Sequence, residues 1–297
     1  MALDGDTALS AAFEAHRSHL VRVAYATVGS LAEAEDVVQE AWLRLQRLER
    51  PDEIRDLRAW LTTTVSRLAL DALGSARARR ERYVGPWLPE PLVEDLAAED
   101  PADRVTLDES VSMALLVVLE RLSAAERSAF LLHDVFGLSF DEVSEVVGRT
   151  PAAVRQLASR ARRHVEEGRP RFPPTRAEQS ELVAAFAAAC AEGDLEALVG
   201  LLDPDVVWRS DGGGKVVASR KIQHGAERVA GINVALARKY PTSDVRLVDV
   251  NGAPGLVLRG DDRDLTVMAF TVDEGRIVAI DVVRNPDKLQ HVDEVLG

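Results

Sequence analysis

The 297-residue chain has a single cysteine, Cys190, and this excludes an intramolecular disulfide and a zinc site built from cysteines. Cys190 falls on the apolar face of an expected helix, which favours a buried thiol over a redox centre. No apolar run approaches the roughly 20 residues of a membrane span, and nothing resembles a signal peptide. The sequence therefore predicts a cytoplasmic protein with no membrane partner, no metal site and no cofactor.

Positive charge is also scarce. A net charge of −13 and a pI of about 5.0 argue against nucleic-acid binding when taken alone. The basic residues are unevenly placed, because all four lysines lie at position 215 or beyond, whereas residues 1–176 carry 23 arginines and no lysine. Those 23 arginines stand against 29 acidic residues, a balance of −6. Any contact with DNA must therefore come from local arginine-rich faces.

Residues 139–164 have the pattern of two short helices joined by a tight turn. Ser139 and Glu142 have capping-box spacing, and Gly148 suits the left-handed conformation that ends a helix. Thr150 then caps a second helix that begins with Pro151. Its inward positions are apolar: Val154, Leu157, Ala158 and Ala161. Its outward positions are polar or basic: Arg155, Gln156, Ser159, Arg160, Arg162 and Arg163. The pattern predicts a helix-turn-helix whose second helix enters a DNA major groove.

The distribution of proline, glycine and charged residues divides the first half of the chain into two predicted domains and a linker. Residues 1–83 predict an all-helical domain, with a helix starting near Leu9, a second capped by Ser30, and a long third helix over 57–82. Residues 84–103 are rich in proline and acidic side chains, which predicts an extended linker. Residues 104–168 form a second helical domain that contains the helix-turn-helix. The proline-rich stretch 169–174 marks the next boundary.

The character of the sequence changes after about residue 175. Helices are expected over 177–191, 194–202 and 226–240, with a short strand at 205–209. Four β-rich runs follow at 245–250, 255–258, 264–272 and 276–283, and Glu274-Gly275 predicts a hairpin between the last two. Residues 177–297 therefore predict an α+β domain. The expected fold class is multidomain, with two all-α domains followed by one α+β domain.

The helical half resembles a sigma-70-family transcription initiation factor of the extracytoplasmic-function type. Residues 34–45, Ala-Glu-Asp-Val-Val-Gln-Glu-Ala-Trp-Leu-Arg-Leu, resemble the family's polymerase-core-binding helix. The stretch from Asp56-Leu57-Arg58-Ala59-Trp60-Leu61 to Arg80 resembles its minus-10 recognition helix, and residues 122–165 resemble its minus-35 recognition domain. The resemblance implies an alternative sigma factor that binds the β′ and β subunits of RNA polymerase core and promoter DNA, and that is not an enzyme.

Three sets of site residues follow from this resemblance. The polymerase-core-binding set is Asp36, Val37, Val38, Gln39, Glu40, Trp42 and Leu43. The minus-10 set is Trp60, Thr63, Thr64, Arg67, Arg77, Arg79 and Arg80, in which stacking and short polar groups would hold an unpaired base. The minus-35 set is Thr150, Arg155, Gln156, Ser159, Arg160, Arg162 and Arg163, in which guanidinium groups would pair with guanine or phosphate. A partly core role for Val37, Trp42 and Trp60 stays open.

Residues 177–297 resemble a SnoaL-like domain, a cone-shaped fold with a curved sheet. Three strings resemble those of sigma factors that carry such an extension, in which it is implied to regulate the sigma factor in cis. The strings are Trp87-Leu88-Pro89-Glu90-Pro91, Asp211-Gly212-Gly213-Gly214-Lys215 and Asn285-Pro286-Asp287-Lys288-Leu289. We expect these strings to meet, with Lys215 or Lys288 paired to linker acids such as Glu90 or Glu94 and with Trp87 supplying apolar contact.

Two other functions fit parts of the sequence. A ligand-sensing DNA-binding regulator would keep the helix-turn-helix but bind duplex DNA without polymerase. A SnoaL-like enzyme would need a general base in a pocket, for which Asp211, His224 and Asp281 are the candidates. Each candidate also has a plain structural explanation, as a turn former, a helix cap or a solvated strand residue. A small ligand in the C-terminal domain is a further candidate partner.

Overall fold

The computed structural model describes residues 2–80, 83–94, 111–168, 174–240, 242–260 and 264–292. The chain forms two compact units, a helical unit of residues 1–81 and 118–167 and an α+β unit of residues 82–117 and 168–297. This division differs from the predicted domains 1–83, 104–168 and 177–297, because the segment expected as a free linker belongs to the α+β unit. Part of that predicted linker, residues 95–103, lies outside the described residues.

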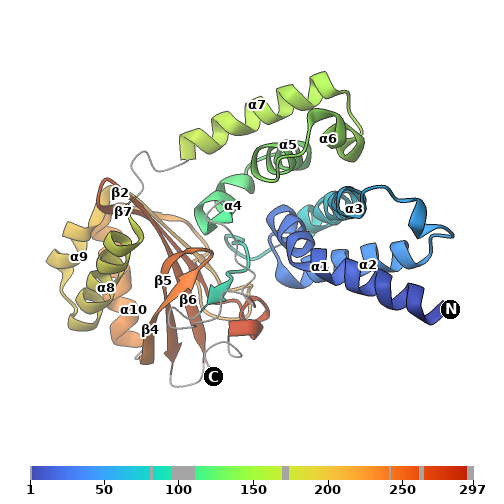
Figure 1. Cartoon of the computed structure of the whole chain (residues 1–297). Helices are drawn as coiled ribbons and strands as arrows, with labels where there is room; N and C mark the ends of the chain where they lie inside the picture. Colours follow the sequence, from blue (N-terminus) through green and yellow to red (C-terminus); the bar gives the residue numbers. More distant parts are fainter. Residues whose placement is uncertain are drawn as a thin grey trace. The chain divides into compact units, whose positions relative to one another are not determined.

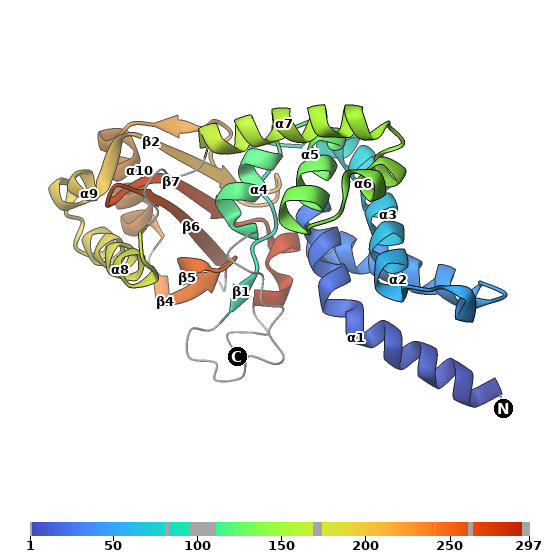
Figure 2. The same ribbon diagram turned by 45° about the horizontal axis from the view of Figure 1, so that its top comes forward.

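The helical unit contains most of the first predicted helical domain and residues 118–167 of the second, whose earlier residues belong to the α+β unit. Its first part is α1 (Ala2–Val28), α2 (Leu31–Gln46), the short η1 (Pro51–Glu53) and α3 (Leu57–Arg80). After α4 (Met113–Leu119), which spans the division between the units, come α5 (Ala124–Phe130), a π-helical turn η3 (Leu131–Val135), α6 (Phe140–Val147) and α7 (Pro151–Gly168). In both views α5 and α6 lie beside α3 (Figures 1 and 2).

The predicted helix-turn-helix is confirmed in its local geometry. Ser139 and Glu142 form a reciprocal capping box at the start of α6, which leaves fewer unsatisfied amides in its first turn. Gly148 ends α6 with φ +66°, a left-handed conformation in which a side chain would be strained. The Thr150 hydroxyl then accepts a hydrogen bond from the Ala153 amide at 3.3 Å and caps α7. Val154, Ala158 and Ala161 of α7 are fully buried, as predicted.

The α+β unit is a seven-stranded mixed sheet with helices on one face. Its strands are β1 (Val93–Glu94), β2 (Leu202–Asp211), β3 (Gln223–His224), β4 (Thr242–Val250), β5 (Ala253–Gly260), β6 (Leu265–Asp273) and β7 (Arg276–Val283), in the order β1-β4-β5-β6-β7-β2-β3. Only the β2–β7 pair is parallel among the described strands. The helices are α8 (Arg176–Glu192), α9 (Leu195–Leu201) and α10 (Ala226–Lys239), and the short η4 (Pro286–Lys288) follows β7 (Figure 1).

Side-chain alternation gives the sheet two buried faces. On the face covered by α8, α9 and α10, Trp208, Ile280 and Phe270 join a large apolar cluster. On the other face a second cluster includes Val250, Val267 and Val283. Residues of the predicted linker contribute Leu88 and Val93 to this second cluster, which also contains Leu289 and Val292 after β7. The linker therefore covers the sheet face opposite the helices.

Candidate functional site

Helix α7 presents the polar face expected of a recognition helix. Arg155, Gln156, Ser159 and Arg163 are exposed. The Arg155 guanidinium lies 5.2 Å from the centroid of the Phe140 ring, and the His133 ring stacks on the same ring at 3.8 Å. A cation–π contact of this kind contributes on the order of 0.5–1 kcal/mol at an exposed site. Arg155 is therefore held at the start of α7, nearest to where base edges would lie.

Two arginines of the minus-35 set have acidic partners in the helical unit. Arg160 contacts Glu126 at 3.0 Å, and Arg162 contacts Asp134 at 2.5 Å. Both arginine side chains are more than 40% exposed, so each pair contributes at most about 1 kcal/mol. A DNA phosphate can replace the carboxylate in such a pair with little loss of free energy. The later half of α7 thus retains the chemistry predicted for backbone contacts.

The minus-10 set on α3 is partly engaged inside the helical unit. Trp60, Thr63 and Thr64 are partly buried, and the Thr64 hydroxyl donates to the Trp60 carbonyl at 2.9 Å. Arg67 is exposed and donates to the Glu145 carbonyl of α6 at 3.1 Å. The side chains of Arg77 and Arg79 lie outside the described residues. In this conformation Arg67 is therefore occupied by the first helix of the helix-turn-helix.

The polymerase-core-binding set divides into a buried and an exposed part. Val37 and Val38 are 7% and 2% exposed, so their side chains belong to the helical core and cannot contact a partner directly. Trp42 is partly buried, and its ring lies 4.8 Å from the Phe13 ring. Of the set, Asp36 and Gln39 are exposed on α2, and Glu40 and Leu43 are partly exposed, as is Trp42 beside Phe13.

A buried charge cluster joins the two halves of the helical unit. The Arg127 side chain of α5 is fully buried, and its Nη2 donates to the Ala26 carbonyl near the end of α1 at 2.9 Å. Arg127 also pairs with Glu120, which in turn binds Arg80 at 2.5 Å. Arg80 donates to the Val28 carbonyl at 2.5 Å. Arg80, a member of the predicted minus-10 set, therefore holds α3 and α1 to the second half of the unit. We call Arg80, Glu120 and Arg127 the latch.

His19 lies at the same contact between the halves. It is within 3.2 Å of the Thr62 hydroxyl of α3, and its ring meets the Phe136 ring edge-on at 6.1 Å. Burial, followed by the charges of Arg58 and Arg22, lowers the pKa of His19 to about 4. The native protein thus keeps His19 neutral at pH values where an unfolded chain would protonate it.

A His19→Gln variant is expected to weaken the acid sensitivity of the helical unit. Between pH 6.5 and about 4 the unfolded state binds a proton that the native state does not, so the free energy of unfolding falls as pH falls through this window. The slope approaches about 1.4 kcal/mol per pH unit for one such group. Urea denaturation at pH 7.0, 6.0 and 5.0 should show a smaller fall in the variant. An equal fall in both proteins would contradict the assignment.

In the α+β unit, Asp211 connects its own loop to two segments that are far apart in the sequence, residues 83–88 and Lys288. Its carboxylate accepts from the Tyr83 hydroxyl at 2.6 Å, from the Leu88 amide at 2.9 Å and from the Gly213 amide at 3.0 Å. It also pairs with the Lys288 ammonium at 2.8 Å, with Asp211 fully buried and Lys288 9% exposed. Burial, and then its bond to Asp211, raises the pKa of the Tyr83 phenol. We call this cluster the aspartate hub.

The aspartate hub corrects the predicted pairing of the three strings. They do meet, but Lys288 pairs with Asp211 and donates to the Leu88 carbonyl, rather than binding a linker acid. The Lys288 ammonium lies 4.0 Å from the Trp87 ring centroid, so Trp87 adds cation–π attraction as well as apolar contact. Glu90 instead lies 3.4 Å from His291. Sequence alone could not show that the acidic partner of Lys288 is Asp211, a buried residue at the end of β2.

The remaining residues of the strings shape the hub. Gly213 has φ +62°, and a Cβ there would lie 2.5 Å from the Asn285 side chain, so glycine is required on both counts. The Asn285 side chain donates to the Tyr83 hydroxyl at 2.8 Å and caps η4. The Lys215–Asp287 pair is 2.6 Å long but more than half exposed. The other members are Pro89 and Gly212, which are buried, Gly214 and Pro286, which are exposed, and Leu289, which is 3% exposed.

Two features of the linker attachment were not predicted. Tyr83 showed no pattern that set it apart, because its role depends on Asp211, 128 residues away. Asn251-Gly252 is the tight turn between β4 and β5, with φ values of +53° and +82°. The Asn251 side chain accepts from the Leu92 amide at 3.1 Å, and the Asn251 amide donates to the Leu92 carbonyl. An Asn-Gly pair between apolar runs is a strong hairpin signal that would have located this turn.

The candidate catalytic residues do not form one site. Successive side chains of a strand point to opposite faces of the sheet. On β2, Trp208 faces the helices, so Arg209 and Asp211 face away from them. Asp281 is paired with Arg209 across β7 and β2 and lies on that same face. Asp281 is 2% exposed and bound to Arg209 at 2.6 Å, and burial raises its pKa. His224 is exposed on β3. Asp211 and Asp281 are thus committed to structural partners, and His224 is an exposed residue of the edge strand β3.

Two parts of the chain match known families. Residues 12–79 match Sigma-70 region 2, and residues 112–165 match Sigma-70, region 4. The chain is 45% identical over 290 residues to the ECF RNA polymerase sigma factor SigJ of Mycobacterium tuberculosis, covering 93% of this chain and 91% of that protein. It is 38% identical over 291 residues to SigI of the same species, covering 97% of each. The crystal structure of M. tuberculosis SigJ matches with a TM-score of 0.79 and 41% identity, covering 95% of this chain and 98% of that chain.

A helix that crosses a membrane must be both long and apolar. Within the described ranges, none of the helices combines the length and the apolar character required to cross a bilayer.

Proposed function

The chain belongs to the extracytoplasmic-function family of RNA polymerase sigma factors, and we propose that its α+β unit controls this initiation factor in cis. Members of the family are not enzymes; they direct RNA polymerase to promoters and start transcription. The observation that carries the proposal is the aspartate hub. It fastens residues 83–94, which follow the region 2 match, to a domain that begins only after region 4.

The hub would act through the path of the linker. Region 2 and region 4 recognise two separate promoter elements, so the segment between them sets which relative placements are reachable. Asp211 and Lys288 together bind both the amide and the carbonyl of Leu88, and β1 is hydrogen-bonded along the edge of β4. Releasing this segment would lengthen the free connection, and holding it would restrict the two regions.

We assign the exposed α7 residues to the minus-35 element and the α3 residues to the minus-10 element. On α2 we assign Asp36, Gln39, Glu40 and Leu43 to the β′ and β subunits of the polymerase core. Arg155 is assigned to a base edge because it lies in the first turns of α7 and is oriented by Phe140. Arg163 is assigned to phosphate because it is exposed and lies about two turns later on α7.

The cis-control proposal is tested by run-off transcription with purified core polymerase. Full-length protein is compared with a version ending at Pro174 and with one lacking residues 285–297, which removes Lys288 from the hub. Both truncations are expected to change the transcript yield while retaining core binding. Failure of the full-length protein to bind core would contradict the sigma function in this chain, and equal yields from all three would contradict cis control. Tight binding to promoter duplex without polymerase would favour a ligand-sensing DNA-binding regulator.

Arg155→Ala is expected to change sequence preference, and Arg163→Ala to change affinity alone. Loss of a base contact costs about 1–3 kcal/mol at one position, whereas loss of a phosphate contact weakens all sequences equally and lowers the salt slope by about one. The measurement is selection by the holoenzyme from promoters with a randomised minus-35 element. The Arg155 variant should lose preference at one or two positions. Unchanged preference would remove Arg155 from the base-contacting set.

A further inference from the structure

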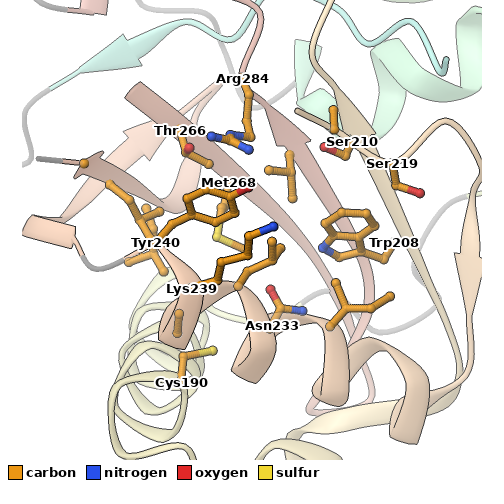
Figure 3. Close-up of a pocket in the computed structure, with 18 of the residues that line it drawn as sticks. Cys190, Trp208, Ser210, Ser219, Asn233, Lys239, Tyr240, Thr266, Met268 and Arg284 are labelled. Atoms are coloured by element: carbon orange, nitrogen blue, oxygen red, sulfur yellow. The ribbon is translucent and has the colours of Figure 1, made fainter. Parts of the chain in front are cut away.

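The α+β unit contains a cavity between the sheet and its helices. Its volume is about 620 Å³, within the range of small-molecule sites. The walls are mostly apolar side chains of α8, α10 and the strands, among them Phe186, Ile232, Leu256 and Met268. Figure 3 shows side chains that line the cavity, with Met268 among those labelled. A cavity of this size and lining suits an apolar molecule rather than a cluster of water.

Trp208 supplies an unsatisfied donor at this cavity. Its side chain is 3% exposed, and its indole nitrogen has no hydrogen-bond partner among the described residues. In Figure 3 this nitrogen is directed into the space between Trp208, Asn233 and Lys239. A buried donor left unsatisfied costs about 1–3 kcal/mol, so an acceptor placed in the cavity would recover that penalty. By contrast, the neighbouring Asn233 amide already donates to the Val229 carbonyl at 2.8 Å.

The charged side chains of the described lining are mainly cationic. They are Arg228, Lys239 and Arg284 against a single carboxylate, Asp264. Arg284 and Arg228 have partners, at 2.5 Å to the Val217 carbonyl and 2.5 Å to the Gln223 side chain. Lys239 has no carboxylate within ion-pair distance in the described part of the chain, and its ammonium lies 5.2 Å from the Tyr240 ring centroid. Cationic lining is notable in a protein of net charge −13.

We propose that this cavity binds an apolar organic acid. The apolar body would fill the space between α8, α10 and the sheet, and an acid oxygen would accept the Trp208 indole hydrogen bond. The Lys239 ammonium, directed into the same space, would pair with the negative charge of the ionised acid group. The site lies on the opposite sheet face from Asp211 and Asp281, so it uses none of the residues of the aspartate hub.

The cavity and the hub nevertheless share strand ends. Ser210 and Arg284 line the cavity, and each is followed in the chain by a hub residue, Asp211 or Asn285. A bound acid would therefore act on the same two strand ends from the other face. This regulatory consequence rests on the proposed cis control, whereas the binding itself does not.

Binding is tested by isothermal titration of the full-length protein, without polymerase, using decanoate and the neutral 1-decanol. Decanoate is expected to bind at one site and 1-decanol at least about tenfold more weakly, because the alcohol cannot pair with Lys239. Lys239→Gln should weaken decanoate binding about tenfold. Arg238→Gln should not, because Arg238 is an adjacent cation, also exposed, that does not line the cavity. Equal binding of acid and alcohol would overturn the acid class.

Two tryptophan substitutions on α10 locate the site. Ala237→Trp fills the cavity and should abolish decanoate binding, whereas Ala235→Trp, exposed on the same helix and outside the lining, should leave it intact. The chain has four tryptophans, so the indole NMR signal that disappears in Trp208→Phe is assigned to Trp208. Decanoate should shift that signal downfield. Absence of decanoate binding, or binding that survives Ala237→Trp, would overturn the proposal, and either result leaves cis control to be judged by transcription alone.

Discussion

An Asp211→Asn variant is expected to lose about 3–5 kcal/mol of unfolding free energy in the α+β unit, because it leaves the Lys288 ammonium buried without its counter-charge. The asparagine amide would also present an N–H group where Asp211 now accepts from either the Leu88 amide or the Tyr83 hydroxyl. Urea denaturation of the full-length protein, followed by far-ultraviolet circular dichroism and tryptophan fluorescence, measures this loss.

A double-mutant cycle separates the ion pair from its surroundings. Lys288→Met should be destabilising by a similar amount, and the double variant should lose much less than the sum, since no unpaired charge is left buried. The exposed Lys215–Asp287 pair, formed by the same two strings, is the matched control. Lys215→Met and Asp287→Asn should each change stability by less than about 1 kcal/mol. Additive losses in the Asp211–Lys288 cycle would contradict direct coupling.

Loss of the hub should also release the linker. Trp87 and Leu88 are held by Lys288 and Asp211, so the Trp87–Leu88 bond is protected while the hub is intact. Chymotrypsin should cut after Trp87 faster in Asp211→Asn than in the Lys215→Met control. A cleavage rate unchanged by Asp211→Asn would mean that the other contacts of the segment, such as Asn251 with Leu92, suffice to hold it.

Local signals in the sequence predicted the helices and most strands correctly. Ser30, Ser139 and Thr150 cap helices at the expected places, because capping needs only residues three positions apart. The Glu274-Gly275 hairpin is likewise local, with φ values of +49° and +74°. The predicted strand at 205–209 proved to be the longer β2, which begins at Leu202 and ends at the hub residue Asp211.

Contacts between distant segments were predicted only in part. The family resemblance indicated that the three strings meet, but not that a buried Asp–Lys pair joins them. Arg127 gave no signal either, because a buried arginine has the same sequence signature as an exposed one until its partners are known. Ala26 and Glu120, which satisfy it, lie on separate helices. The sequence thus located the recognition helices but not the contact that holds them together.

An Arg127→Met variant is expected to loosen the helical unit and to raise its affinity for core polymerase at least tenfold. The minus-35 and minus-10 elements are named for their positions, which are about 25 nucleotides apart, and at 3.4 Å per base pair this separation is roughly 85 Å. Helix α3 contacts α6 directly, with Arg67 bonded to Glu145 at 3.1 Å, so both elements cannot be occupied in this conformation. The unit must therefore open, and the latch opposes opening. Removing the buried guanidinium weakens the closed state by about 3 kcal/mol, because Ala26 and Glu120 lose their partner.

The measurements are small-angle X-ray scattering of the free protein and anisotropy titration with labelled core polymerase. Arg127→Met should show a larger radius of gyration with unchanged helical circular dichroism. It should also bind polymerase more tightly, because polymerase binds the open state and the variant populates that state more. Arg121→Met, an exposed arginine six residues earlier, is the matched control and should change neither quantity. A variant that expands but binds polymerase no better would show that opening does not limit assembly. A variant that neither expands nor binds better would show that the Arg67–Glu145 and His19–Phe136 contacts hold the unit closed without the latch.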